Sequence, residues 1–99
     1  MTALPDVFLT TPFAHRALHD VADGRPENSR AAICAAMDAG YGVEIDLQLS
    51  RDGVAMVFHD YHLGRLTAAK GPVRQCDATE LASILLTGGT EGIPTFAEV

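Results

Sequence analysis

Hydrophobic and polar residues in the first part of the chain follow first a strand-like and then a helix-like pattern. The short apolar run at residues 7–13 predicts a buried strand that ends just before His15. Residues 20–26 contain Asp, Gly and Pro and predict a loop. Residues 27–39 are rich in alanine and are followed by Gly40, which is typical of an amphipathic helix with a glycine stop. The apolar face of this helix is expected to hold Ile33, Ala36, Met37 and Gly40.

Residues 41–49 alternate between apolar and polar side chains, which predicts a single strand. The Arg-Asp-Gly sequence at residues 51–53 predicts a tight turn, and residues 54–58 form a second apolar run that ends at His59. The two runs are close enough to form a hairpin or to be sequential strands of one sheet. The order strand, helix, strand in the chain up to residue 49 favours a parallel strand pair with a helical crossover.

The remainder of the chain combines irregular segments with two helix starts. Residues 61–77 are interrupted by Gly and Pro and are predicted to be irregular. Residues 77–80 have capping-box spacing and predict a short helix, and residues 95–98 repeat that spacing after a glycine-rich loop at 87–92. The packed side of the helix after residue 77 is expected to hold Leu81, Ile84 and Leu85.

Composition narrows the class of protein. The 99 residues are 47% hydrophobic and 20% charged, which is ordinary for one small globular domain spanning residues 1–99. The formal net charge of -6 disfavours a nucleic-acid partner and an anionic membrane surface. A small phosphate substrate remains compatible with this charge, because a bound cation can reverse the local field.

The cysteines and the apolar stretches bear on location. Cys34 and Cys76 do not make a disulfide framework, and Cys34 is expected to be a buried free thiol within its apolar helical run. The first residues lack the pattern of a signal peptide, and the chain contains no apolar stretch near the ~20 residues that span a bilayer. The expected location is therefore cytoplasmic, with no transmembrane segment.

Glu44 and Asp46 are the first candidates for chemistry. They are two residues apart on the predicted strand, so their side chains are expected to point the same way. Paired carboxylates on one face of a buried sheet are costly unless something compensates, and a hard divalent cation is the usual compensation. The alternative is an antiparallel strand whose polar face meets water.

Histidines close two of the predicted strands. His15 follows the first apolar run and His59 follows the run at residues 54–58. Enzymes on parallel α/β sheets place their chemistry at the carboxyl ends of strands, and histidine is the natural acid or base at neutral pH. Arg16 follows His15 and can hold a phosphate through two hydrogen bonds. His19 and His62 have no comparable setting and are interpreted as surface or loop residues.

The chain resembles the glycerophosphodiester phosphodiesterases. Each matching segment is weak alone, but together they occur in the family order and at family-like spacing over nearly the whole chain. The matching segments are Ala-His-Arg-Ala at 14–17, Pro-Glu-Asn-Ser at 26–29, Gly-Val-Glu-Ile-Asp-Leu at 42–47, Arg-Asp-Gly at 51–53, Val-Phe-His-Asp at 57–60, Leu-Gly-Arg-Leu-Thr at 63–67 and Ile-Pro-Thr-Phe-Ala-Glu-Val at 93–99.

The resemblance implies an α/β fold, the N-terminal part of a TIM (β/α)₈ barrel with a small insertion at about residues 61–92. A TIM barrel typically takes ~250 residues, so the barrel is not expected to close within this chain. An unclosed parallel sheet exposes an edge and an apolar face, so self-association is also expected.

The resemblance also implies roles for the candidate residues. Glu44 and Asp46 would bind a divalent metal, Mg²⁺ or Ca²⁺. His15 and His59 would serve as general base and general acid, in an order left open, and Arg16 would contact the phosphate. The reaction would be metal-dependent hydrolysis of glycerophosphodiesters to glycerol 3-phosphate and an alcohol.

Other positions qualify this picture. Glu27 and Asn28 would support the site from the start of the first helix. Ala17 stands where the family usually has glycine, and a positive φ there would carry a penalty of ~1 kcal/mol or more. A shifted loop could then misplace Arg16.

Three interpretations remain open. The chain is expected to be the N-terminal piece of a full enzyme, inactive by itself. The alternatives are a short protein that keeps part of the site as a binding or assembly module without catalysis, and an unrelated small α/β domain with a coincidental pattern.

Overall fold

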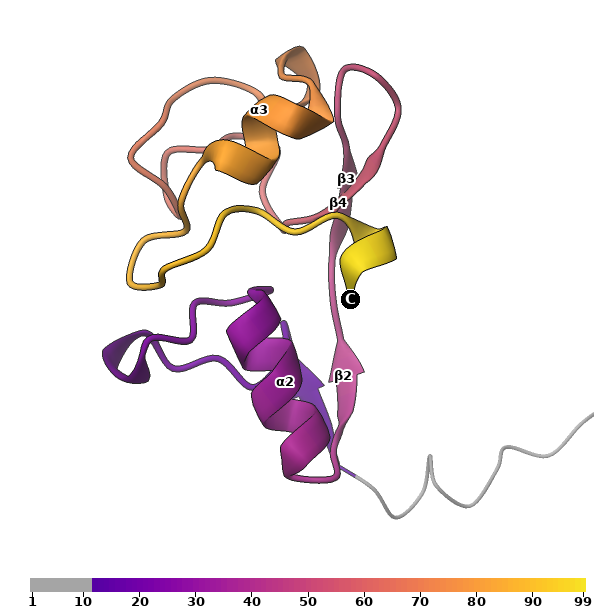
Figure 1. Cartoon of the computed structure of the whole chain (residues 1–99), viewed down its shortest axis with the longest axis vertical. Coiled ribbons are helices and arrows are strands. Elements are labelled where there is room, and N and C mark those ends of the chain that lie inside the picture. The colour runs from indigo at the N-terminus through magenta and orange to yellow at the C-terminus, as the bar shows by residue number, and fades with distance from the viewer. Residues whose placement is uncertain (1–11) are drawn as a thin grey trace, which may run out of the picture.

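The computed structural model describes residues 12–99, and its first unit is a parallel strand pair joined by a helix (Figure 1). β1 (Phe13–His15) lies beside β2 (Gly42–Glu44), and α2 (Arg30–Asp38) forms the crossover after the 3₁₀ helix η1 (Val21–Asp23). The predicted parallel pair with a helical crossover is therefore confirmed. The strand predicted at residues 7–13 lies largely outside the described residues, and β1 continues through His15.

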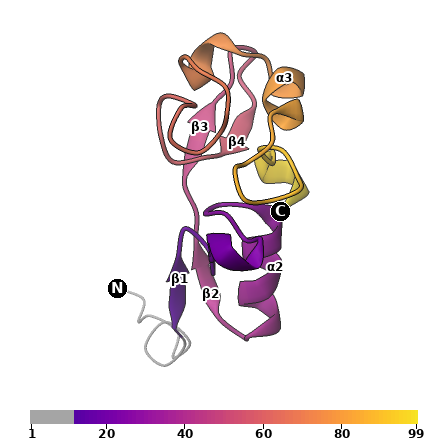
Figure 2. The same cartoon turned by 90° about the vertical axis from the view of Figure 1, so that its left-hand side faces the viewer.

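The single strand predicted for residues 41–49 is wrong. The chain there forms β2 and then β3 (Leu47–Leu49), and these strands belong to different sheets. β2 pairs with β1, whereas β3 pairs with the antiparallel β4 (Ala55–Val57), so the structure has the hairpin, one of the two alternatives left open for these runs. Asp46 lies between the two pairings, and its carbonyl accepts from the Phe58 N–H at 2.9 Å. Figure 2 shows the chain passing from β2 in one unit to β3 in the other.

Helix α2 begins later than predicted, because the Ser29 side chain caps it by accepting from the Ala32 N–H at 3.1 Å. Met37 is 70% exposed and Cys34 is also exposed, so both were wrongly expected to be buried. The neighbouring strands are only three residues long and cover a narrow side of α2, so the helix positions on either side of that contact remain in water. The buried residues of α2 are Ala32, Ile33 and Ala36.

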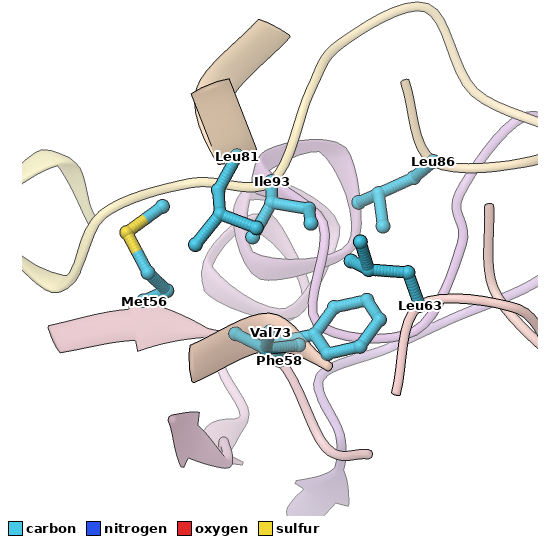
Figure 3. Packing of buried hydrophobic residues seen from close by; sticks show 7 residues of the cluster. All are labelled: Met56, Phe58, Leu63, Val73, Leu81, Leu86 and Ile93. Atoms are coloured by element: carbon cyan, nitrogen blue, oxygen red, sulfur yellow. The ribbon is translucent and has the colours of Figure 1, made fainter. Parts of the chain in front are cut away.

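The larger hydrophobic core lies in the second unit, around β4 and the segments that follow it (Figure 3). α3 (Ala78–Ser83) and the 3₁₀ helices η2 (Val73–Gln75) and η3 (Phe96–Glu98) belong to this unit. Buried apolar side chains thus fix segments that have little regular structure. The cluster consists of Met56, Phe58, Leu63, Val73, Leu81, Leu86 and Ile93.

Both predicted capping boxes are present, at the starts of α3 and η3. Leu81 is fully buried as expected, and Ile84 is partly buried against the core. Leu85 is 58% exposed, because α3 ends at Ser83 and the helical period no longer applies two residues later. No helix within residues 12–99 is long and apolar enough to cross a membrane.

Candidate functional site

The carboxyl ends of β1 and β2 place His15 directly opposite Glu44 in the parallel register. His15 Nε2 lies 3.7 Å from Glu44 Oε1, and both side chains are substantially exposed. The parallel pairing therefore brings the first predicted histidine to the first predicted carboxylate. This is the arrangement expected when chemistry gathers at one edge of a parallel sheet.

The turn after β1 uses left-handed backbone at consecutive non-glycine residues. Arg16 has φ 56° and Ala17 has φ 64°, so the condition under which Ala17 carries a conformational penalty is met. The Ala17 N–H donates to the carbonyls of Ala14 and Glu44 at 3.2 and 3.0 Å, and its methyl is buried in the cluster with Ala32. These contacts hold the turn in place, and Arg16 remains in the site.

The guanidinium of Arg16 joins the two units of the chain. Its Nη1 donates to Glu27 Oε2 at 3.1 Å, and its Nη2 lies 3.0 Å from His59 Nε2. Arg16 Nε is buried, has no hydrogen-bond partner among residues 12–99, and lies 3.9 Å from Asp46 Oδ2. Arg16 thus contacts the second histidine as well as a buried carboxylate.

The proton on His59 can be assigned from its neighbours. A guanidinium has only donors, so His59 Nε2 must accept from Arg16. His59 Nδ1 then carries the hydrogen and donates it to Asp60 Oδ1 at 2.7 Å. The hydrogen bond from Arg65 holds the pKa of Asp60 well below its usual range, although partial burial opposes this and the His59 hydrogen bond adds to it.

Asp46 lies where the two units meet. Asn28 Nδ2 donates to Asp46 Oδ2 at 3.1 Å, and the Asp46 N–H donates to Asn28 Oδ1 at 3.3 Å. Asn28 is almost fully buried and has φ 58°. Its predicted supporting position at the start of the first helix therefore corresponds to a direct contact with Asp46.

Glu44 and Asp46 fit a divalent cation in one respect that the structure can test. Although the Glu44 side chain as a whole is substantially exposed, its Oε1 atom is buried and has no hydrogen-bond partner among residues 12–99, with His15 Nε2 3.7 Å away. Within the same residues no group of three His, Cys, Asp or Glu side chains is arranged to hold a metal. The described part of the chain therefore leaves the predicted metal role of these two carboxylates a prediction.

An open cleft of ≈ 480 Å³ lies beside His59. Gln48 borders it and fixes its neighbour, because Gln48 Nε2 donates to the His59 carbonyl at 2.9 Å. His62, interpreted from the sequence as a surface residue, is exposed but also borders this cleft. Sequence reasoning missed the roles of Asp60 and Gln48, although Asp60 directly follows His59. The cleft is lined by Asp46, Leu47, Gln48, His59, Asp60, Tyr61 and His62.

A sequence model of the glycerophosphoryl diester phosphodiesterase family matches residues 15–99. The chain belongs to this family. It is 39% identical over 74 residues to a glycerophosphodiester phosphodiesterase of Bacillus altitudinis, a match that covers 74% of this chain and 29% of that relative. It is 41% identical over 68 residues to human glycerophosphodiester phosphodiesterase 1, covering 67% of this chain and 19% of the human protein.

Solved structures of the family have the same fold as this chain. An Oleispira antarctica phosphodiesterase in complex with the product sn-glycerol-3-phosphate aligns with a TM-score of 0.79 and 34% identity, covering 92% of this chain and 38% of that chain. A glycerophosphodiester phosphodiesterase from Agrobacterium tumefaciens aligns with a TM-score of 0.76 and 30% identity, covering 88% and 39%. This family chain therefore has the fold of part of a TIM barrel with unclosed sheets, as the resemblance implied. It spans less than two fifths of the length of these relatives.

Proposed function

We propose that this chain supplies the front part of a site that hydrolyses glycerophosphodiesters to glycerol 3-phosphate and an alcohol, with Mg²⁺ or Ca²⁺. The observation that carries the proposal is the gathering of predicted site residues from three strand ends. These residues are His15, Arg16, Glu44, Asp46 and His59. Family membership supports the reaction class, and the Oleispira antarctica relative holds sn-glycerol-3-phosphate.

Arg16 is the proposed phosphate contact. Its guanidinium carries donors in a planar fork that suits a phosphodiester, and its Nε has no hydrogen-bond partner among residues 12–99. A phosphate that attracts the Nη2 donor would draw it from His59 Nε2, which lies 3.0 Å away in this structure. Substrate binding would thereby expose the lone pair of the histidine.

His15 and His59 are the proposed proton carriers. A hydroxyl oxygen of the substrate forms a bond to phosphorus while the bond to the head-group oxygen breaks, and water then opens the resulting cyclic phosphate. In the first step one histidine accepts the hydroxyl proton and the other donates a proton to the departing oxygen. The exposed His15 and the cleft-lining His59 are both accessible for such transfers.

Glu44 and Asp46 are the proposed cation ligands. Carboxylate oxygens suit the hard cations Mg²⁺ and Ca²⁺, and Glu44 Oε1 lacks any other hydrogen-bond partner among residues 12–99. A bound cation would offset the negative charge on the phosphoryl oxygens. Glu44 also lies beside His15, with Glu44 Oε1 3.7 Å from His15 Nε2, so the proposed cation ligand and the proposed proton carrier are neighbours.

A chimeric enzyme tests the proposal directly. This chain would replace the matching segment of the Bacillus altitudinis relative, and release of glycerol 3-phosphate from glycerophosphocholine would be measured with Mg²⁺, Ca²⁺ or EDTA. We expect metal-dependent turnover that falls by roughly 10²–10⁴-fold in His15→Ala and in His59→Ala. His19→Ala is the matched control, because His19 is exposed and lies outside the cleft beside His59.

The same assay separates hydrolysis from the alternative of a binding or assembly module. The 99-residue chain by itself is expected to be inactive. A folded chimera that binds glycerol 3-phosphate but does not hydrolyse the diester would contradict the proposed reaction and favour the binding module. Equal rates for His59→Ala and the unsubstituted chimera would contradict the role of that histidine.

A further inference from the structure

A closed ring of charged and polar side chains connects the start of α2 with the segment after β4. Each member contacts the next through a hydrogen bond of 2.6–3.1 Å, and the last contacts the first. The ring therefore spans both units of the chain. Its members in order are Arg16, Glu27, Arg65, Asp60 and His59.

Arg65 and Asp60 are the two members of this ring to which the sequence alone assigned no role, and of these two Arg65 is the one that contacts two carboxylates. Its Nε and Nη2 donate to Asp60 Oδ2 and Oδ1 at 2.9 and 3.0 Å, which is a bidentate pair. Its Nη1 donates to Glu27 Oε1 at 2.6 Å. All three guanidinium nitrogens of Arg65 therefore hold carboxylates that in turn contact His59 and Arg16.

The backbone around Arg65 is anchored. Leu63 belongs to the core of the second unit, and the Thr67 N–H and hydroxyl both donate to the Leu63 carbonyl at 3.1 and 2.9 Å. Leu63 and Thr67 are both buried. Arg65 thus extends from a loop that is fixed by packing and hydrogen bonds. Its hydrogen bond to Glu27 connects the two units of the chain.

We propose that Arg65 is a positioning residue, which acts through Asp60 to keep the hydrogen of His59 on Nδ1 and acts through Glu27 to hold Arg16 beside His59 Nε2. Asp60 accepts the Nδ1 hydrogen only while its carboxylate faces the imidazole of His59. The fork of Arg65 holds the carboxylate in that orientation. The Nε2 lone pair of His59 then points toward Arg16.

The charge state of Glu27 supports the second part of this role, in which Arg65 holds Arg16 in place through Glu27. Burial of the Glu27 carboxyl raises its pKa, but Arg65 and Arg16 outweigh this and the pKa lies below its usual value. Glu27 therefore stays charged between two guanidinium groups. Without Arg65, the Glu27 carboxylate would keep its hydrogen bond from Arg16 but lose the one from Arg65. Glu27 could then move, and it would no longer hold Arg16 beside His59.

The consequence for catalysis rests on the proposed function, but the tautomer of His59 does not. Imidazole ¹⁵N spectra of the 99-residue chain report which ring nitrogen carries the hydrogen, whether or not the chain hydrolyses anything. His59→Gln identifies the His59 signals by their disappearance. Asp60→Ala shows the pattern that follows when the acceptor of the Nδ1 hydrogen is removed.

We expect His59 of the unsubstituted chain to have its hydrogen on Nδ1. In Arg65→Met the ratio of the Nδ1–H to the Nε2–H form should fall by up to roughly tenfold, in the same direction as in Asp60→Ala. Arg51→Met is the matched control, because Arg51 makes a bidentate pair with Asp77 at 2.9 and 2.8 Å on the exposed surface. That variant should keep the tautomer ratio of the unsubstituted chain.

An unchanged His59 pattern in folded Arg65→Met would overturn the proposal. If Arg65→Met does not fold, Arg65→Lys decides the question, because lysine keeps the charge but lacks the planar fork. We expect Arg65→Lys to lower the ratio as well, and a ratio equal to that of the unsubstituted chain would overturn the role of the fork. Loss of hydrolysis in the chimera with an intact Nδ1–H pattern would count against the proposed function instead.

Discussion

Asn28 and Asp46 contact each other through two hydrogen bonds of opposite direction. The Asn28 amide donates to the Asp46 carboxylate, and the Asn28 carbonyl accepts from the Asp46 N–H. The Asn28 N–H also donates to the Arg16 carbonyl at 2.8 Å, so one buried residue holds both the carboxylate and the arginine turn. Asparagine suits this position because it tolerates the left-handed φ of 58° better than most residues.

The first prediction concerns these contacts. Asn28→Ala should lower the free energy of unfolding in urea by about 2–3 kcal/mol, because two side-chain hydrogen bonds are lost and buried groups are left without partners. Asn28→Gly loses the same bonds but adopts a positive φ easily, so it should be less destabilised than Asn28→Ala by about 1 kcal/mol. Unchanged stability in Asn28→Gly would show that the bonds to Asp46 contribute little.

The second prediction concerns Ala17. Ala17→Gly relieves about 1–2 kcal/mol of strain from the left-handed backbone. It also loses a buried methyl worth about 0.8 kcal/mol, and it raises the conformational entropy of the unfolded chain, which destabilises the folded state. The terms nearly cancel, so the free energy of unfolding should change by less than about 1 kcal/mol. Ala17→Val adds a β-branched side chain at φ 64° and should cost at least about 2 kcal/mol.

The same two substitutions at Ala31 are the control for the second prediction. Ala31 is exposed on α2, so neither substitution there changes the core. Ala31→Gly should cost no more than about 1 kcal/mol, the value for glycine in a helix interior, because Ala31 lies in the first turn of α2. A large gain of stability in Ala17→Gly would mean that strain at this turn outweighs the packing of its methyl against Ala32.

The backbone around the site was largely predictable from local patterns. A strand, a helix with a stop and a second strand imply a parallel pair, and that pair alone places His15 beside Glu44. The short turn between two apolar runs indicated the hairpin after β2 as one of two alternatives. The break between β2 and β3 was not predictable, because alternation continues through Asp46 while the pairing partner changes from β1 to β4.

The side-chain network of the site was much less predictable from the sequence than the backbone. Arg65 and Glu27 are separated by 38 residues, and no periodicity relates them. Burial of Cys34 and Met37 was mispredicted for a related reason, since an apolar position becomes buried only where another element covers it. The cytoplasmic location, self-association, the insertion bounds at 61–92 and the metal roles of the carboxylates stay predictions.

The third prediction concerns the cation. Millimolar Ca²⁺ or Mg²⁺ should raise the midpoint of thermal unfolding of the chain, because a ligand that binds only the folded state stabilises it by mass action. Glu44→Gln should abolish this rise, and EDTA should reverse it in the unsubstituted chain. Glu91→Gln is the control, since Glu91 is exposed and pairs with Arg30. A metal-dependent rise that survives in Glu44→Gln would contradict the ligand role.

The fourth prediction concerns the core that supports the segment carrying Arg65. Leu81 and Leu85 lie four residues apart, and one is fully buried while the other is 58% exposed. Leu81→Ala should lower the free energy of unfolding by about 2–5 kcal/mol through lost burial and a residual cavity. Leu85→Ala should change it by no more than about 0.5 kcal/mol. Equal costs in urea unfolding would show that the cluster around Leu81 is not the packed core.

The last prediction concerns acid. Asp60 and Glu27 both have folded-state pKa values below their usual ones, Asp60 chiefly through its hydrogen bond from Arg65 and Glu27 because its two arginines outweigh burial. A carboxylate whose pKa is depressed by folding contributes stability that is fully present above its unfolded pKa of about 4 and is lost as the pH falls through the folded value. The free energy of unfolding should therefore decline as the pH drops below about 4, measured by urea unfolding at stepwise lower pH.

Arg65→Met removes the cation shared by both carboxylates, so the stability of that variant should fall less steeply in the same pH range. The curves for the unsubstituted chain and for Arg65→Met should be far apart near neutral pH and converge in acid, where Asp60 and Glu27 become protonated. Arg51→Met retains the whole ring and should therefore keep the larger part of the acid-dependent loss. Parallel curves for Arg65→Met and the unsubstituted chain would show that Arg65 does not hold these two carboxylates in their charged form.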